Sequence, residues 1–278
     1  MPQPSSADDP RQVHRTTRPL AVVTGGSEGI GFAIAQVLAA RGHDLLLIAR
    51  HPERLAAAAG EIGAISPVKI ATFAQDLTDA DLCERLDAEL ARLDAHIDLL
   101  VNAAGMGLSG PLAEADPQRL DELIALNVTV PSRLMRHVLP GMTARRRGGI
   151  INIASMGGLI PGPFQASYYA SKAYLVSFSE AVAAEGRRDG VRVTVVAPGP
   201  VDTEFHAKMG AENALYRRLL PSSTPKDVAR WAVRGHELGL KVVVPGLLNM
   251  LGAVALKLVP HTLTVPLMAW LLDPRRQK

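Results

Sequence analysis

Short apolar runs alternate with longer helix-forming segments along most of the chain. The short runs are nearly all apolar, as expected for strands that helices cover on both faces of a parallel sheet. This alternation is typical of βαβ units, so it predicts an α/β fold with one doubly wound domain. The predicted strands cover residues 20–24, 44–49, 68–73, 97–101, 149–153, 191–196 and 241–244, and the predicted helices cover residues 30–41, 52–62, 79–93, 117–143, 166–188 and 225–237.

Both ends of the chain depart from this alternation. Residues 1–19 are polar and rich in proline and lack the apolar run of a secretory signal, so we expect a disordered tail. Residues 246–278 are apolar, but prolines interrupt them before they reach the ~18 apolar residues of a spanning helix. We therefore expect a domain over residues 20–245, followed by an apolar extension.

Composition narrows the functional classes. With 278 residues, 47% hydrophobic and 21% charged, the chain can bury a sizeable core and is not intrinsically disordered. A net charge of only +3 argues against a dedicated nucleic-acid binder. Cys83 is the single cysteine and the histidines show no metal-binding spacing, so we expect no metal site and a reducing, cytoplasmic location.

A glycine-rich turn follows the first predicted strand and opens the first predicted helix. Its pattern, from Thr24 to Gly31, is T-G-x-x-x-G-x-G. Gly25 permits a tight turn, Gly29 lets the backbone approach a phosphate, and Gly31 lets the helix pack closely on the strand. Because the first N–H groups of a helix bind anions, the turn predicts a site for the pyrophosphate of a dinucleotide.

A second motif combines a phenol with an ammonium group. Tyr168 and Lys172 are four residues apart in a predicted helix, so they share one face. A neighbouring ammonium stabilises a phenolate, so we expect Lys172 to lower the pKa of Tyr168. Ser155 precedes Tyr168 by 13 residues and follows a predicted strand. Tyr169 would point about 100° away around the helix, which predicts a packing or interface role for it.

These motifs, in this order, resemble those of the short-chain dehydrogenase/reductase family over roughly residues 20–245. The resemblance implies a single Rossmann-type parallel sheet of about seven strands with helices on both faces, in an NAD(P)-binding catalytic domain. Further segments match the family pattern at Asp76-Leu77, Asn102-Ala103-Ala104-Gly105, Asn127 and Pro198-Gly199.

The resemblance also implies catalytic roles. Tyr168 would donate a proton during carbonyl reduction and accept one during alcohol oxidation, and Ser155 would hydrogen-bond the substrate oxygen. Lys172 would bind the nicotinamide ribose, and Asn127 would hold a water that links Lys172 to solvent. The expected cofactor-binding residues are Gly25, Ser27, Gly29, Ile30, Gly31, Arg50, Asp76, Leu77, Asn102, Ala103, Gly105, Lys172, Pro198, Gly199, Val201 and Thr203.

The end of the second predicted strand bears on the choice of nicotinamide cofactor. NAD enzymes place an acid there, whereas this chain has Arg50, whose guanidinium suits the 2′-phosphate of NADP. Glu28 argues against NADP, because many relatives that prefer NADP carry a basic or neutral residue at its position. NADP is the expected cofactor, with NAD as the alternative.

By analogy with the family, the residues expected to line the substrate pocket are mostly apolar, under a mobile lid over residues 201–221. A lipophilic ketone or secondary alcohol, or a 3-oxoacyl chain, therefore fits better than a sugar. A non-catalytic NADP-binding sensor or scaffold is the alternative function. The expected pocket residues are Met106, Met156, Leu159, Phe164, Gln165 and Pro200.

Assembly is expected to involve the long helices and the apolar extension. Family members pair through helices at the positions of residues 117–143 and 166–188, so we expect a homodimer or homotetramer. The extension needs apolar surroundings, which a second subunit would provide. The alternative is peripheral attachment of this segment to a membrane surface.

Overall fold

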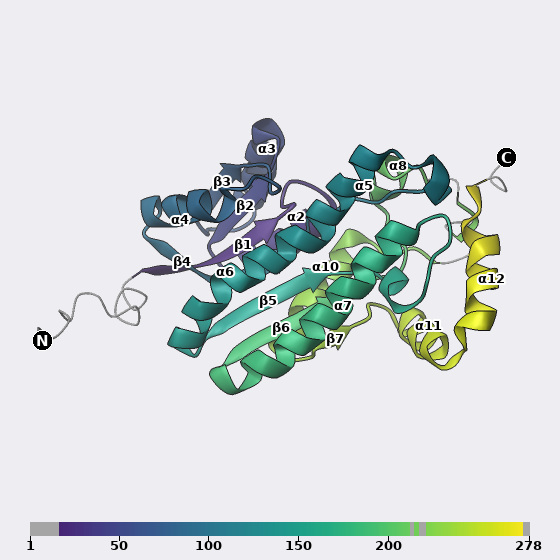
Figure 1. Cartoon of the computed structure of the whole chain (residues 1–278). Helices are drawn as coiled ribbons and strands as arrows, with labels where there is room; N and C mark the ends of the chain where they lie inside the picture. The colour runs from purple at the N-terminus through teal and green to yellow at the C-terminus, as the bar shows by residue number, and fades with distance from the viewer. Residues whose placement is uncertain (1–16, 212–213, 217–220, 275–278) are drawn as a thin grey trace, which may run out of the picture.

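The computed structural model describes residues 17–211, 214–216 and 221–274. Within them, seven parallel strands form one sheet in the order β3-β2-β1-β4-β5-β6-β7, which confirms the predicted doubly wound α/β fold (Figure 1). The strands are β1 Arg18–Thr24, β2 Leu45–Ala49, β3 Ile70–Ala74, β4 Ala95–Asn102, β5 Gly148–Ile153, β6 Val191–Val196 and β7 Val242–Val243.

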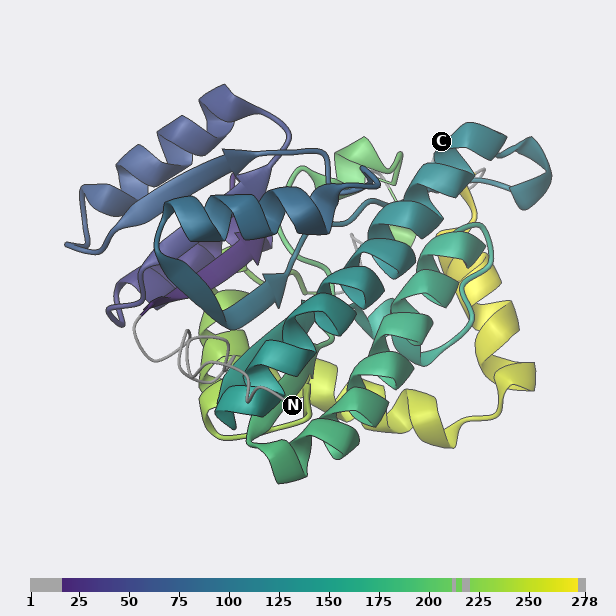
Figure 2. The ribbon, with the colours of Figure 1, turned by 60° about the vertical axis from the view of Figure 1, so that its left-hand side comes forward.

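Helices cover both faces of the sheet and bury an apolar core on each. One core joins the sheet to α2 Gly29–Ala39, α3 Pro52–Gly63 and α10 Pro225–Glu237. The other joins it to α4 Leu82–Arg92, α6 Val130–Arg145 and α7 Ala166–Gly186, which lie on the same side of the sheet in Figure 2. The strands are apolar throughout because side chains on both of their faces are buried.

The strand order reverses between β1 and β4. β1 pairs with β2 on one side and with β4 on the other, so the connections run in opposite directions from this point. A crevice opens at such a switch point, at the carboxyl ends of the strands, and ligands of open α/β sheets bind there. The glycine turn after β1 therefore lies at the edge of this crevice.

Two boundaries differ from the sequence prediction. Arg18 and Pro19, expected in the tail, belong to β1, where the Arg18 side chain forms an ion pair with Asp44 at 2.6 Å. The single helix expected over residues 117–143 is divided into α5 Pro117–Ile124, a π-helical turn Ala125–Thr129, and α6. Single π turns widen a helix locally and occur often at functional sites.

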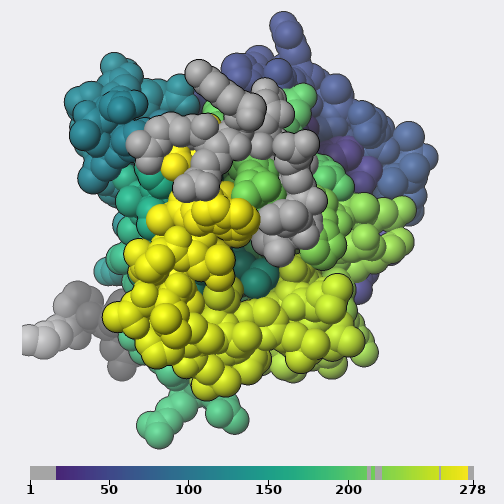
Figure 3. Space-filling model, turned by 90° about the vertical axis from the view of Figure 1, so that its right-hand side faces the viewer, coloured from purple at the N-terminus to yellow at the C-terminus, as the bar shows by residue number. Residues whose placement is uncertain are grey.

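The extension folds into two helices, α11 Leu247–Leu258 and α12 His261–Leu272. Val259 and Pro260 separate them, as expected from the interrupted apolar pattern. No helix within the described part of the chain is both long and apolar enough to cross a membrane. In Figure 3, α11 and α12 form one continuous surface beside a hollow.

Candidate active site

A cavity of about 1490 Å³ lies at the carboxyl ends of the strands. It brings together almost all the site residues predicted from the sequence; the exceptions are Asn102 and Asn127, which lie behind its wall. The predicted residues that line it are Gly25, Ser27, Gly29, Ile30, Gly31, Arg50, Asp76, Leu77, Ala103, Gly105, Ser155, Tyr168, Lys172, Pro198, Gly199, Val201 and Thr203.

The glycine turn has the backbone geometry that its sequence predicts. Gly25 has a φ of 65°, and a Cβ at this position would lie 3.0 Å from the backbone of Ala104 on the neighbouring strand end. Thr24 anchors the same region, because its Oγ1 accepts hydrogen bonds from Ala103 N at 3.1 Å and Ala104 N at 3.2 Å. The turn after β1 and the turn after β4 are thus held against each other.

Asn102 supports the strand ends from inside the sheet. Its Nδ2 donates to Asn152 Oδ1 at 2.8 Å, and Asn152 Nδ2 donates in turn to Ser179 Oγ at 2.8 Å. All three side chains are buried. This network links β4, β5 and α7, so the Asn102 side chain holds the scaffold, and its predicted contact with a cofactor stays a prediction.

Ser155 and Tyr168 approach each other across the cavity. Ser155 begins a short 3₁₀ helix, Met156–Leu159, and its Oγ accepts a hydrogen bond from Gly157 N at 3.0 Å. Burial raises the pKa of Tyr168 to about 12, although a hydrogen bond with Ser155 acts in the opposite direction. Tyr168 is therefore a protonated phenol at neutral pH.

Lys172 lies one helical turn after Tyr168. Its Nζ donates to Ile153 O at 2.9 Å and lies 5.8 Å from the centroid of the Tyr168 ring. Burial lowers the pKa of Lys172 to about 8. Desolvation of the buried phenolate dominates the pKa of Tyr168, and the predicted lowering of this pKa by Lys172 stays a prediction.

The π turn gives Asn127 its position behind the cavity. Asn127 Oδ1 accepts from Met106 N at 2.9 Å, and Nδ2 donates to Met106 O at 2.8 Å and to Ser171 Oγ at 3.1 Å. A Cβ on Gly105 would lie 3.2 Å from Asn127 Oδ1 and 3.4 Å from Lys172 Nζ. Asn127 therefore fixes the strand β4 turn beside Lys172, while its predicted role in a water relay stays a prediction.

Tyr169 packs against the turn that follows β5. Its ring lies over Gly157, where a Cβ would come within 3.2 Å of it. Burial raises the pKa of Tyr169 well above that of an ordinary tyrosine. The predicted packing role is confirmed, and Tyr169 contributes to the apolar cluster of Met209, Ala211, Ala214, Tyr216 and Leu272 with Tyr168, Phe205, Met268 and Leu271.

Basic and acidic groups gather at the other end of the cavity. Burial opposes the charged form of Asp76, but hydrogen bonds from Thr78 and the charge of Arg50 outweigh it and keep the pKa of the Asp76 carboxyl below its usual range. Arg50 itself is exposed and lines the cavity at the end of β2. A cation is thus available where a 2′-phosphate is expected.

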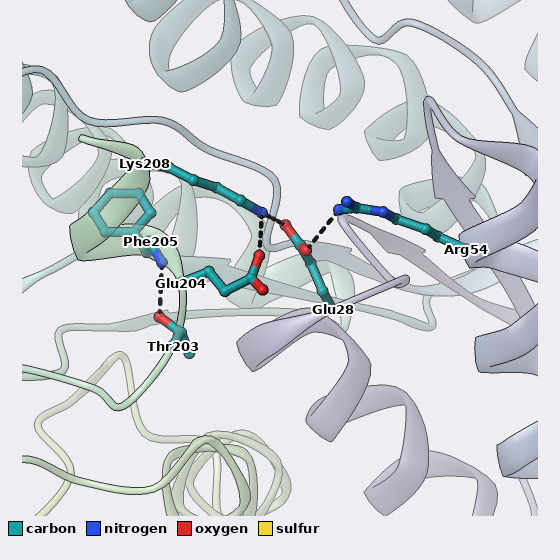
Figure 4. Close-up of polar contacts among 6 residues, drawn as sticks. All are labelled: Glu28, Arg54, Thr203, Glu204, Phe205 and Lys208. Atoms are coloured by element: carbon teal, nitrogen blue, oxygen red, sulfur yellow. Dashed lines mark hydrogen bonds and ion pairs between the residues drawn. The ribbon is translucent and has the colours of Figure 1, made fainter. Parts of the chain in front are cut away.

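Glu28, the acid in the glycine turn, is paired on both of its oxygens. Oε1 lies 2.5 Å from Lys208 Nζ and Oε2 lies 3.2 Å from Arg54 NH1, as Figure 4 shows. Lys208 also contacts Glu204 at 3.1 Å. These pairs join the glycine turn to α3 on one side and to α8 Phe205–Lys208 on the other, so the negative charge expected to disfavour NADP is shared between two cations.

A family profile described as short chain dehydrogenase matches residues 19–214. The chain belongs to the short-chain dehydrogenase/reductase family. It is therefore an oxidoreductase of the class that acts on alcohol and carbonyl groups. The match ends before α10, so the last strand, α11 and α12 lie outside the matched segment of this short-chain dehydrogenase.

Named relatives and solved structures agree with this assignment. The very-long-chain 3-oxoacyl-CoA reductase of Bos taurus is 38% identical over 189 residues, which cover 66% of this chain and 60% of that protein. A short-chain dehydrogenase from Sphingobium yanoikuyae in complex with NADPH has a TM-score of 0.77 at 30% identity, covering 90% of this chain and 95% of that one. The bulky-bulky ketone specific alcohol dehydrogenase from Comamonas testosteroni has a TM-score of 0.72 at 28% identity, covering 88% and 96%.

The C-terminal helices of this dehydrogenase contribute to the cavity, which the sequence analysis missed. From α11 and α12 the lining residues are Leu248, Asn249, Gly252, Leu256, Met268 and Leu271. The four-residue spacing of Leu248, Gly252 and Leu256 places them on one face of α11. This spacing could have indicated from the sequence that one face of the helix lines the cavity. Asn249 packs on the turn after β6, because a Cβ on Gly199 would lie 2.9 Å from its Oδ1.

The predicted pocket residues are only partly correct. Met106, Met156, Gln165 and Pro200 line the large cavity, together with Glu28, Arg54 and Lys208, which the sequence analysis did not place there. Leu159 lines a smaller, separate pocket of about 510 Å³, and Phe164 lines neither. Of the lid expected over residues 201–221, the positions 212, 213 and 217–220 lie outside the described residues, and α8 is its described helix.

Within the described residues, no group of three or more His, Cys, Asp or Glu side chains is placed to hold a metal ion.

Proposed function

We propose that the chain is an NADP-dependent oxidoreductase that interconverts a lipophilic ketone and its secondary alcohol. The observation that carries this proposal is the convergence of Ser155, Tyr168 and Lys172 on the cavity that the glycine turn also lines. A dinucleotide placed along this cavity would have its pyrophosphate at the turn and its nicotinamide near Tyr168.

NADP is the proposed cofactor because the residues at the adenosine end fit its 2′-phosphate. Arg50 supplies a cation there, no carboxylate occupies the tip of β2, and Glu28 is already paired with Arg54 and Lys208. The related dehydrogenase from Sphingobium yanoikuyae is an NADPH complex, which supports this choice. The other predicted cofactor-binding residues that line the cavity are proposed to contact the rest of the dinucleotide. Bound NADPH would supply the hydride.

Tyr168 is proposed as the proton donor. With a pKa of about 12 it carries its proton at neutral pH, which suits the direction of carbonyl reduction. Ser155, hydrogen-bonded to the same phenol, would share in binding the substrate oxygen and stabilise its developing charge. Lys172 would bind the ribose, and Asn127 would hold a water that links Lys172 to solvent.

The substrate is proposed to be apolar near its reacting carbon. Phe205, Met209, Met268 and Leu271 belong to one apolar cluster with Tyr168 and line the cavity. Such a wall favours lipophilic ketones or 3-oxoacyl chains over sugars. The names of two similar proteins, a 3-oxoacyl-CoA reductase and an alcohol dehydrogenase specific for bulky-bulky ketones, point to the same range.

A substrate panel tests this function. Purified protein with NADPH is expected to reduce at least one aryl ketone, diketone or 3-oxoacyl thioester, which is measured as loss of absorbance of NADPH. A variant with Lys172 replaced by Met should fail on every member of the panel. Tight binding of NADPH without turnover of any substrate would support the alternative, a non-catalytic sensor or scaffold with the same fold.

We further propose a cytoplasmic homodimer or homotetramer. Ile124 on α5 and Tyr174 on α7 are exposed large side chains on helices through which related proteins pair. The outer faces of α11 and α12 are also apolar, with Leu258 78% and Leu263 65% exposed. A second subunit over these faces would remove this apolar surface from water.

Light scattering in detergent-free buffer is expected to give the mass of a dimer or tetramer. Leu251→Gln with Leu258→Gln changes two exposed side chains that do not line the cavity, so it should weaken the assembly while leaving NADPH binding intact. A different result would instead support peripheral membrane attachment. The wild-type protein would then be monomeric in solution and float with anionic liposomes, and the double variant would no longer float.

A further inference from the structure

Gly252 leaves a gap in the inner face of α11. Leu248 and Leu256 lie about one helical turn on either side of it, and all three residues line the large cavity. A Cβ built on Gly252 would lie 3.6 Å from Met156 Cε, which is an ordinary packing distance. The Met156 side chain therefore lies against the helix, in the space that a larger residue at position 252 would enter.

Packing does not require a glycine at this position. An alanine would fit beside Met156 and would favour the helix, because glycine is among the least favourable residues in a helix interior. Gly235 in α10 shows the contrast, since a Cβ there would overlap Val243 Cγ2. The effect of Gly252 is thus on the cavity that it lines rather than on the contact between the helix and its neighbours.

The turn after β6 holds both sides of this gap. Pro198 O accepts a hydrogen bond from Met156 N at 2.9 Å, and the Asn249 side chain of α11 packs on Gly199. Asn249 Nδ2 also donates to Pro245 O at 2.8 Å, which fixes the start of α11. Because the backbone is held on both sides, a larger residue in the gap would push the Met156 side chain into the cavity or fill the cavity itself.

The gap lies beside the group proposed to bind the reacting oxygen. Met156 directly follows Ser155 at the start of the 3₁₀ helix, and both residues line the same cavity as Tyr168. A carbonyl bound by Ser155 and Tyr168 would therefore have one of its two substituents near Met156. Methionine is unbranched and flexible, so its position depends on the space that its neighbours leave.

We propose that Gly252 is a specificity-determining residue. It lets Met156 lie back against α11 and so keeps the cavity wide enough for a ketone with a branched or larger group on this side of its carbonyl. The proposal concerns the width of the substituent and not its polarity. It rests on the proposed function, because it needs the reacting carbonyl to lie at Ser155 and Tyr168.

The experiment compares two ketones of the class that wild type reduces, identical except for a methyl or an isobutyl group on one side of the carbonyl. We expect Gly252→Leu to lower kcat/KM for the isobutyl ketone by about 10- to 100-fold more than for the methyl ketone, since excess methylene groups in a close-fitting pocket have effects of this order. Gly252→Ala, whose methyl group fits, should change this ratio by less than about threefold. NADPH affinity should stay unchanged in both variants, because the added atoms face Met156 rather than the glycine turn.

Met156→Ala, added to Gly252→Leu, separates this role from a disturbed helix. The shorter residue returns to the cavity the space that the leucine takes, so the ratio should recover to within about threefold of wild type. A structural defect would not recover, because Met156→Ala removes packing contacts and adds none.

Gly60→Leu is the matched control, because Gly60 is an exposed glycine of α3 outside the cavity, and none of the described residues comes within 4 Å of a Cβ there. It should leave the ratio unchanged. Equal losses on both ketones in Gly252→Leu, an unchanged ratio, lost NADPH binding or no recovery with Met156→Ala would overturn the role of Gly252. A wild type that reduces only the methyl ketone would overturn it as well. If wild type binds NADPH but reduces no member of the substrate panel, the proposed function itself fails.

Discussion

Tyr168→Phe is expected to lower kcat for carbonyl reduction by about 10²- to 10⁴-fold, the contribution of a positioned proton donor. The substitution removes one oxygen and leaves the ring, whose packing against Phe205 at 5.5 Å is retained. NADPH affinity should therefore change little, because the lost oxygen is proposed to act on the substrate. Steady-state kinetics and fluorescence titration with NADPH measure the two quantities separately.

Tyr169→Phe is the control for Tyr168→Phe. It removes the same oxygen from the adjacent residue, whose ring packs over Gly157 and Gly162. We expect its kcat to stay within about threefold of wild type, since a change of packing alone rarely reaches the effect of losing a proton donor. If Tyr169→Phe were the inactive variant and Tyr168→Phe the mild one, the assignment of the donor would be wrong.

The parallel sheet and the grouping of Ser155, Tyr168 and Lys172 could be predicted because each depends on short-range spacing. Apolar runs specify strands buried on both faces, and an interval of four residues specifies one helix face. The glycine pattern is equally local, since the need for a close approach at Gly25 appears in the residue type itself.

Other features were missed for identifiable reasons. The π turn at Asn127 interrupts a helix predicted to be continuous, and Pro131 was the available signal, because it has no N–H to donate to the carbonyl of residue 127. The pairing of Glu28 with Lys208 joins residues 180 positions apart, so no local pattern contains it. The raised pKa of Tyr168 could not be predicted either, because the depth of burial is a tertiary property.

The extension presents apolar side chains on two opposite faces. Its apolar residues suggested an interface, and the exposed side of α11 and α12 retains that property. Their inner side closes the cavity through Leu248, Gly252 and Met268, and Leu272 is fully buried. The hydrophobicity of the sequence reflects the apolar side chains of both faces together, so it could not separate the cavity wall from the outer surface.

Arg50→Ala is expected to raise KM for NADPH by about 10- to 150-fold, which corresponds to losing a charge-assisted contact of about 1.5 to 3 kcal/mol. KM for NADH should change far less, because NADH has a hydroxyl group where NADPH has the 2′-phosphate. Arg54 is a poor substitute for the missing cation, since its guanidinium is already shared with Glu28 at 3.2 Å. Initial rates with the two cofactors, at one saturating substrate concentration, measure the effect.

Arg92→Ala is the control for Arg50→Ala. Arg92 is an exposed arginine of α4 paired with Glu89 at 2.6 Å, outside the cavity, so its loss changes the net charge equally without touching the cofactor site. Any effect of net charge alone would appear in both variants and would weaken as salt is added. A selective loss of NADPH in Arg50→Ala, with Arg92→Ala unchanged, identifies Arg50 as the group that recognises the phosphate. Equal changes in KM for NADPH and NADH in Arg50→Ala would show that the 2′-phosphate is bound elsewhere, and the exposed Arg54 beside Glu28 would become the next residue to replace.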